Sequence, residues 1–401
     1  MMSITLPFLP SLAVMLIGAK VSGGLSRWIG LPAVFGELLA GLLMGPTVLG
    51  LVTPDGALSD LAELGVLVLM FLAGLETDLL QLRSVGKSAT LVAVGGVVLS
   101  MAAGFGLAQA TGFGLAPSLF ASAIVASTSV GIAAQVFWQL GRLLSREGQT
   151  VLAAAVFDDV LGVIVLTLVV AVVGGAEVLL PLAKMGLFFV AAVVLGQYAL
   201  PIIAVRMHRH LSSETLVAIV LAMVLVSSWL ASEVGGVAAI TGAYMAGVFI
   251  GRTHIRGKTL RNITSIGFGF LIPLFFVSVG MAVTPQDLGL SPVFAALFTV
   301  AAIVAKTLGC LGGARVSGMN WTMASRVGFG MVARGEVALV IAAVGLKAGY
   351  IDAGLYSAAV VMTLASALVT PLLLKLSYGG GRPSDQEGEL GPLTAAMVGE
   401  G

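Results

Sequence analysis

Two adjacent aspartates, Asp158 and Asp159, lie within residues 153–166, near the middle of a long segment that is otherwise almost wholly apolar. At the centre of a bilayer, one charged side chain costs at least about 3 kcal/mol. If the segment spans a membrane, something must compensate for two carboxyl groups at that depth. The pair therefore predicts an ion or proton site inside a membrane.

Three more ionisable residues fall at the same expected depth. Lys306 lies near the middle of the apolar segment 292–314, and Arg334 and Glu336 lie at the middle of segment 323–348. Such charges are less costly beside an opposite charge than alone, so we expect them to form one site. Adjacent helical residues point about 100° apart. One aspartate can therefore pair with Lys306 while the other faces a cavity.

This arrangement suits exchange of a small monovalent cation for protons. A hard cation prefers oxygen ligands, which Asp159, the hydroxyls of Thr128 and Ser129, and freed carbonyl groups can supply. Proton and cation then compete for one carboxylate. A structural interpretation stays open, in which the Asp158–Lys306 and Arg334–Glu336 pairs only fix helix packing; for the second pair it is as good as the functional one.

Composition supports a membrane protein. The chain of 401 residues is 58% hydrophobic and 10% charged, whereas soluble domains carry about 25% charged residues. A net charge of +1 argues against a nucleic-acid partner. The single cysteine, Cys310, provides neither a disulfide nor a metal cluster, and we expect no cofactor.

Apolar runs of the length that spans a bilayer predict an all-α polytopic membrane protein with thirteen transmembrane helices. The predicted limits are 5–26, 33–51, 61–80, 88–111, 116–140, 147–174, 180–205, 213–232, 235–252, 263–284, 292–314, 323–348 and 354–377. We expect 1–377 to form the transport domain and 378–401 a short, disordered cytoplasmic tail.

The loops between the thirteen predicted helices alternate between basic and acidic. Loops after odd-numbered helices hold most basic residues, and loops after even-numbered helices hold Asp55, Asp60, Glu177, Asp287 and Asp352. Because basic loops stay in the cytoplasm, the N-terminus is predicted outside and the C-terminus inside. Three further acidic residues, Glu37, Glu76 and Glu233, are expected near helix ends, either as solvated interfacial charges or in access funnels.

The chain repeats itself at an offset of 206 residues. Residues 36–45, with Gly36, Gly41 and Gly45, recur as residues 242–251, and Gly74 recurs as Gly280. An offset of seven helices reverses the orientation across the membrane. The pattern predicts two inverted repeats of six helices, which implies alternating access with a site at the midplane.

The same offset relates residues 127–129 to residues 333–335. Small hydroxylated residues and glycine weaken a helix in the first segment, and a glycine between two charges does so in the second. Unwound backbone at this depth is tolerated when it is buried in protein or lines a cavity. We predict two crossed, interrupted helices beside the aspartates.

At these residues the sequence resembles the second cation:proton antiporter family, most closely its NapA-type sodium/proton antiporters. The signatures that carry the resemblance are residues 125–132, 157–162, 273–281, 305–309 and 333–339. The resemblance implies a homodimeric elevator antiporter in a bacterial inner membrane, in which helices 4–6 and 11–13 move against a dimer scaffold of helices 1–3 and 8–10, with helix 7 as the linker.

By position, the resemblance makes Asp159 the principal ion-binding carboxylate and Asp158 the partner of Lys306. It makes Thr128 and Ser129 the hydroxyl pair at the helix crossing. An Asp-Asp pair with this lysine is similar to the electrogenic branch, whereas electroneutral relatives commonly have Asn at the Asp158 position. The sequence has no Gly-x-Gly-x-x-Gly motif, so no regulatory nucleotide-binding domain is expected.

Other functions remain as alternatives. A K⁺/H⁺ antiporter would use the same residues, because cation selectivity depends on cavity dimensions. A sodium-dependent organic-anion symporter with inverted repeats would offer only Arg334 for its anion. An intramembrane aspartyl protease and an ion channel are disfavoured, because their sequence motifs are missing.

Overall fold

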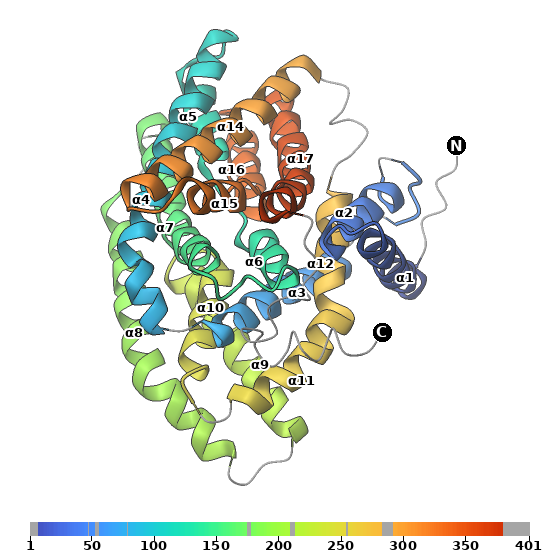
Figure 1. The fold of residues 1–401 in the computed structure, drawn as a ribbon. Helices are drawn as coiled ribbons and strands as arrows, with labels where there is room; N and C mark the ends of the chain where they lie inside the picture. Colours follow the sequence, from blue (N-terminus) through green and yellow to red (C-terminus); the bar gives the residue numbers. More distant parts are fainter. Residues whose placement is uncertain are drawn as a thin grey trace.

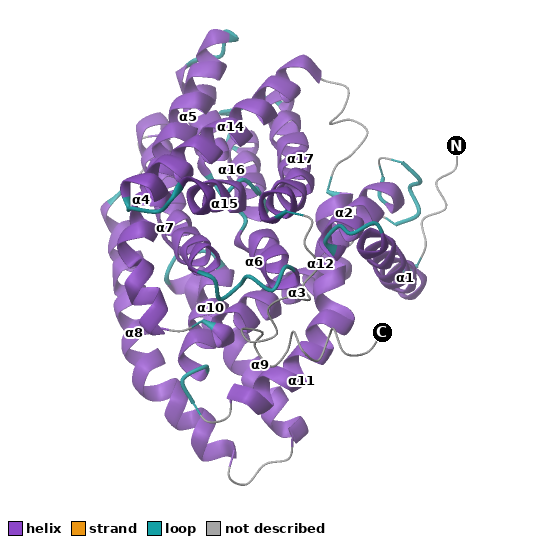
Figure 2. Cartoon of the chain, in the orientation of Figure 1, coloured by secondary structure: helices purple, strands orange, loops and turns teal. Residues whose placement is uncertain are grey.

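The computed structural model describes residues 7–46, 48–52, 56–77, 79–174, 178–208, 213–253, 256–282 and 292–379. Within these ranges, every regular element is a helix, and most connections are short (Figures 1 and 2). The expected tail lies outside the described residues from position 380 onward.

The helices follow the apolar runs of the sequence. Their bounds are α1 Phe8–Trp28, α2 Ala33–Met44, α3 Gly56–Glu76, α4 Leu79–Ala110, α5 Leu115–Ala126, α6 Val130–Gln139, α7 Arg146–Gly174, α8 Leu179–His208, α9 Ser213–Trp229, α10 Ala239–Ile250, α11 Arg256–Ile266, α12 Ile272–Met281, α14 Pro292–Val316, α15 Trp321–Gly330, α16 Glu336–Lys347 and α17 Ala353–Tyr378. Two π-helical turns, η1 Leu230–Val234 and η2 Gly267–Leu271, continue α9 and join α11 to α12.

Ten helical stretches among the described residues are long and apolar enough to cross a membrane, and three shorter apolar helices accompany them: Ala33–Met44, Ala239–Ile250 and Val337–Lys347. A span needs about 20 apolar residues, which stretches such as Pro292–Val316 provide. The protein is therefore an integral membrane protein.

Two helices are shorter than their hydrophobic runs predict. The expected helix 33–51 ends at Met44, because Gly45 and Pro46 follow and proline cannot continue a helix. The expected helix 235–252 begins only at Ala239, because Gly236 takes a φ of 63°, a left-handed conformation that favours glycine. Hydropathy does not register either break.

The contacts between helices divide them into two bundles. In Figure 1, α14–α17 lie at the top, away from α9 and α11 at the bottom. We call the bundle of α4, α5, α6, α7, α14, α15, α16 and α17 the inner bundle. The flanking bundle comprises α1, α2, α3, α9, α10, α11 and α12, with α8 packed against its α9 and α10. Helix α6 reaches the flanking bundle through Gly131, whose environment includes Val66 of α3 and Phe275 of α12.

Glycines hold the flanking bundle together in two related contacts. A side chain at Gly41 of α2 would overlap the carbonyl group of Val277 in α12, and one at Gly247 of α10 would overlap the carbonyl group of Phe71 in α3. Both members of the first contact lie 206 residues from a member of the second. The repeat seen in the sequence therefore recurs as two equivalent helix contacts, in which α2 corresponds to α10 and α12 corresponds to α3.

Candidate ion site

Two helices of the inner bundle are interrupted where they meet. Helix α5 ends at Ala126 and α6 begins at Val130, whereas α15 ends at Gly330 and α16 begins at Glu336. The backbone N–H of Ser129 donates to the carbonyl oxygen of Ala333 at 2.8 Å. This bond joins the two non-helical stretches directly, at the positions where small residues predict weak helix.

The first interruption carries an ion pair. The Nζ atom of Lys306, on α14, lies 2.6 Å from Oδ2 of Asp158, on α7, and both side chains are almost completely buried. The Thr128 hydroxyl donates a short hydrogen bond to the same carboxylate oxygen. Lys306 also donates to the carbonyl oxygen of Ala126 at 2.7 Å. The lysine thus neutralises a carboxylate and the C-terminal end of α5, where a helix dipole favours a cation.

Asp159 points to a different neighbour, as the rotation of adjacent helical residues requires. Its Oδ2 accepts a hydrogen bond of 3.3 Å from the hydroxyl of Thr241, on α10 of the flanking bundle. Only 5% of Asp159 is exposed. The two carboxylates therefore have separate surroundings, one paired with lysine inside the inner bundle and one at the seam between the bundles.

Some buried polar atoms beside this ion pair have no hydrogen-bond partner among the described residues. They include the Ser129 hydroxyl and Oδ1 of Asp158. Buried polar atoms are normally satisfied by protein, water or a ligand. Carboxylate and hydroxyl oxygens suit a hard cation. The interruption therefore presents oxygen atoms of the kind that bind a small monovalent ion.

The second interruption is built around Arg334. Its guanidinium donates to the carbonyl oxygens of Met331, Val332 and Ala302 at 3.3, 3.0 and 3.2 Å, and its backbone N–H donates to Ser366. The residue is fully buried. The side chain of Glu336 lies outside the described residues, so the expected Arg334–Glu336 pair stays a prediction.

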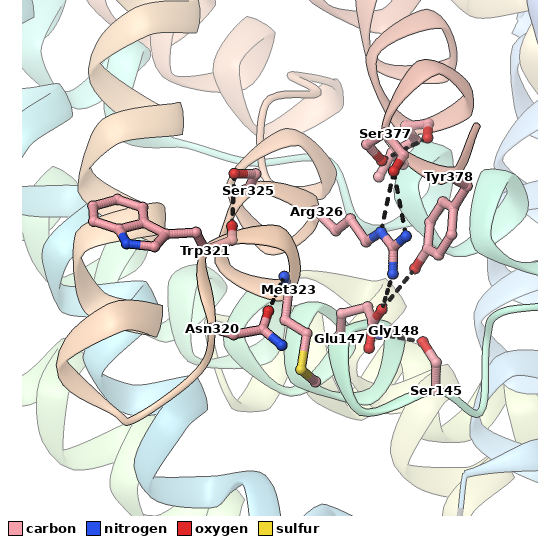
Figure 3. Close-up of polar contacts among 11 residues, drawn as sticks. Ser145, Glu147, Gly148, Asn320, Trp321, Met323, Ser325, Arg326, Ser377 and Tyr378 are labelled. Carbon is pink, nitrogen blue, oxygen red and sulfur yellow. Dashed lines mark hydrogen bonds and ion pairs between the residues drawn. The ribbon is translucent and has the colours of Figure 1, made fainter.

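A second polar cluster lies at the start of α7. One guanidinium nitrogen of Arg326, on α15, lies 3.0 Å from a carboxylate oxygen of Glu147, which also accepts from the Tyr378 hydroxyl at the end of α17 (Figure 3). Arg326 further donates to the carbonyl group of Ser377. These contacts join α7, α15 and α17; α7 leads to the aspartates, and α15 leads to the second interruption.

Sequence reasoning missed Thr241 and the Glu147–Arg326 contact. A threonine in an apolar helix does not stand out in the sequence as a functional residue, and Arg326 resembles the other basic residues expected near helix ends.

The sequence prediction for Glu37 needs correction. Only 7% of Glu37 is exposed, and one of its carboxylate oxygens has no partner among the described residues. Its interpretation as a solvated interfacial charge is wrong, because its side chain is buried on α2, which packs on α1 and α12.

Comparison with known proteins gives one consistent result. The chain matches the sodium/hydrogen exchanger transmembrane family over residues 12–376. It is 34% identical over 374 residues to the Na⁺/H⁺-K⁺ antiporter GerN of Bacillus cereus, covering 93% of this chain and 96% of that protein. To the Na⁺/H⁺ antiporter of Enterococcus hirae it is 33% identical over 373 residues, covering 92% and 97%.

A solved structure shows the same fold. The sodium proton antiporter MjNhaP1 from Methanocaldococcus jannaschii aligns with a TM-score of 0.71 at 18% identity, over 93% of this chain and 96% of that one. The interrupted helices and the buried ion pair are consistent with the family match. The chain belongs to the sodium/hydrogen exchanger family of cation:proton antiporters, which are membrane transporters and not enzymes.

Proposed function

We propose that this protein exchanges Na⁺ for protons across the membrane by alternating access, and that the exchange is electrogenic. The observation that carries the proposal is the buried Lys306–Asp158 pair at 2.6 Å with Asp159 next to it, where two interrupted helices meet. Relatives described as Na⁺/H⁺ antiporters support Na⁺ as the ion, and Li⁺ is a second substrate to test.

In this proposal, Asp159 is the carboxylate for which Na⁺ and protons compete. Thr128, Ser129 and freed carbonyl groups contribute further oxygen ligands. The Ser129 hydroxyl and Oδ1 of Asp158 support this assignment, since both are buried acceptors that have no hydrogen-bond partner in the described part of the chain. Arg334 and Glu336 stabilise the crossing without binding the transported ion.

Lys306 is proposed to carry the second proton. When Na⁺ reaches Asp158 and Asp159, the lysine loses its carboxylate partner and can release a proton. Two protons then move for each Na⁺, and each net charge moved is worth about 2.3 kcal/mol per 100 mV of membrane potential. A membrane potential can thereby drive Na⁺ export without a pH gradient.

The equivalent glycine contacts, exchanged between α2–α12 and α3–α10, support two inverted repeats. We propose thirteen membrane crossings, counting α5–α6, α11–α12 and α15–α16 as one each. The inner bundle would carry the ion past the flanking bundle as an elevator, in a homodimer that the flanking bundles form. Basic loops support an N-terminus outside and a C-terminus inside, and the bacterial relatives support a bacterial cytoplasmic membrane.

A K⁺/H⁺ antiporter is the second candidate, and one comparison favours it: the relative GerN is described as a Na⁺/H⁺-K⁺ antiporter. The same carboxylates would serve, because selectivity between these cations depends on the size of the site. A sodium-dependent organic-anion symporter lacks such support.

Proton flux into proteoliposomes tests the proposal. Internal pH is followed with a proton-sensitive dye while Na⁺, Li⁺ or K⁺ is added, and Asp159→Asn serves as the control. We expect Na⁺ to trigger a flux that is absent in the folded Asp159→Asn variant. No flux with any cation would overturn the exchange function, and an equal flux in the variant would overturn the role of Asp159.

A further inference from the structure

Thr241 lies on the opposite side of the bundle seam from the carboxylate that it contacts. Its hydroxyl donates to Oδ2 of Asp159 at 3.3 Å, and 1% of Thr241 and 5% of Asp159 are exposed. Thr241 belongs to α10 of the flanking bundle, and Asp159 belongs to α7 of the inner bundle. Any movement of one bundle past the other changes this distance.

The flanking bundle holds Thr241 in place. One turn further along α10, the Tyr244 hydroxyl lies 3.1 Å from the hydroxyl of Thr77, beside the end of α3. Gly247 brings α10 so close to α3 that a side chain there would overlap the Phe71 carbonyl group. Thr241 therefore moves with α3 and α10, and not with the aspartates.

Around this contact the seam is apolar. A cavity of about 410 Å³ lies between α7, α8 and α10. Its lining consists of Val156, Phe157, Val160, Phe189, Tyr244, Met245, Val248 and Phe249. Three of these residues flank the aspartates on α7. A polar contact beside such a surface is shielded from bulk water, which strengthens its electrostatic effect.

The related position in the other half of the chain has no hydroxyl group. Residue 241 lies 206 residues beyond Phe35, in the segments where Gly36, Gly41 and Gly45 correspond to Gly242, Gly247 and Gly251. Phe35 occupies the first turn of α2, as Thr241 occupies the first turn of α10. The residue that lies 206 positions beyond Asp159 is Ala365, so the contact between Thr241 and Asp159 has no counterpart of the same chemistry in the other half of the chain.

We propose that Thr241 is a ligand of the transported cation in one conformation only, supplied by the flanking bundle and absent from the site in the opposite conformation. A threonine hydroxyl has one donor and two acceptor lone pairs. It can donate to Asp159 in the empty site and turn to offer a lone pair to Na⁺ in the loaded site. This inference rests on the proposed cation exchange.

The test compares Na⁺ affinity at the two faces of the protein. The protein is reconstituted in one orientation, and the KM for Na⁺ is measured with Na⁺ added on either side at fixed pH. Thr241→Val keeps the shape of the side chain and removes the hydroxyl. We expect its KM to rise about fivefold at one face, the value for loss of one hydrogen bond, and less than about twofold at the other.

Controls separate a ligand from a packing effect. Thr241→Ser should restore the KM, because it keeps the hydroxyl. Thr264→Val removes another buried hydroxyl of the flanking bundle, one that donates to the Leu260 carbonyl group of its own helix, and should leave both KM values unchanged. If valine is not tolerated in folding, Thr241→Ala replaces it.

Two failures are distinguishable. An unchanged KM at both faces, or an equal rise at both, in a wild-type background that exchanges Na⁺ for protons would overturn the role of Thr241 alone. A wild-type protein without exchange would overturn the proposed function and this inference with it.

Discussion

The two helix interruptions meet the same electrostatic requirement with different cations. Each leaves carbonyl groups at the C-terminal end of a half-helix inside the membrane, where a positive charge is favourable. Lys306 donates to Ala126 at the end of α5, and Arg334 donates to Met331 and Val332 after α15. Lys306 also holds a carboxylate, whereas the described side-chain contacts of Arg334 are to neutral carbonyl groups.

This difference separates a site that can change its charge from one that cannot. A buried lysine can release its proton, whereas arginine stays protonated in proteins. The same helix serves both cations, because Ala302, which accepts from Arg334, precedes Lys306 by one turn of α14. The first interruption thus has a titratable cation, Lys306, which fits a role in ion exchange. The second has a permanent cation, Arg334, which fits a structural role.

Replacing the lysine should have the largest effect. Lys306→Gln leaves Asp158 buried without its cation, and breaking a buried pair in this way costs about 3–5 kcal/mol. We expect a strongly lowered Tm in detergent. In the fraction of Lys306→Gln protein that is reconstituted in the folded state, we expect exchange that no longer responds to an imposed membrane potential. An active Lys306→Gln variant that keeps its voltage response would remove the lysine from proton transport.

Replacing the arginine should affect stability and leave the charge movement intact. Arg334→Lys keeps the positive charge but cannot reach three carbonyl groups at once, so it loses one or two hydrogen bonds of about 1 kcal/mol each. The Tm should fall less than in Lys306→Gln, and voltage dependence should match that of the unaltered protein. Loss of the voltage response in a stable Arg334→Lys variant would break the distinction between the two interruptions.

The sequence predicts the charged part of this comparison better than the neutral part. Asp158 and Lys306 stand out because a charge in an apolar segment is costly wherever its partner lies. The interruptions are predictable too, since glycine and small hydroxylated residues weaken a helix locally. Thr241 carries no such signal, and its contact with Asp159 joins residues 82 positions apart in different bundles. Polar neutral contacts depend on the packing of the bundles, which local sequence does not specify.

The same limit applies to the fold. Hydropathy predicts the spans, because length and apolar content decide membrane crossing. It misses the early end of α2 at Gly45, and it misses the π-helical turn Gly267–Leu271, where Lys20 of α1 donates to the Phe268 carbonyl group. These features depend on backbone geometry and on partners far away in the chain.

The two hydroxyls of the first interruption should respond differently to removal. Thr128 donates to the Asp158 carboxylate, and a hydrogen bond to a charged group contributes about 1.5–3 kcal/mol. Ser129 has no partner for its hydroxyl among the described residues. Thr128→Val should therefore lower the Tm, whereas Ser129→Ala should leave the Tm nearly unchanged and raise the KM for Na⁺. A large stability loss in Ser129→Ala with an unchanged KM would make Ser129 structural.

The smallest effect is expected at the cluster that joins α7, α15 and α17. Arg326 is partly exposed, so its pair with Glu147 should contribute at most about 1 kcal/mol. Asp158 lies three turns further along α7, about 16 Å away at 1.5 Å per residue. Arg326→Gln should lower the Tm slightly without changing the KM or the voltage response. Arg315→Gln is a matched control, because Arg326 lies over the ring of Tyr378, and Arg315, in the last turn of α14, lies over the ring of Trp321. A changed voltage response in Arg326→Gln alone would mean that proton coupling extends from the first interruption to the start of α7.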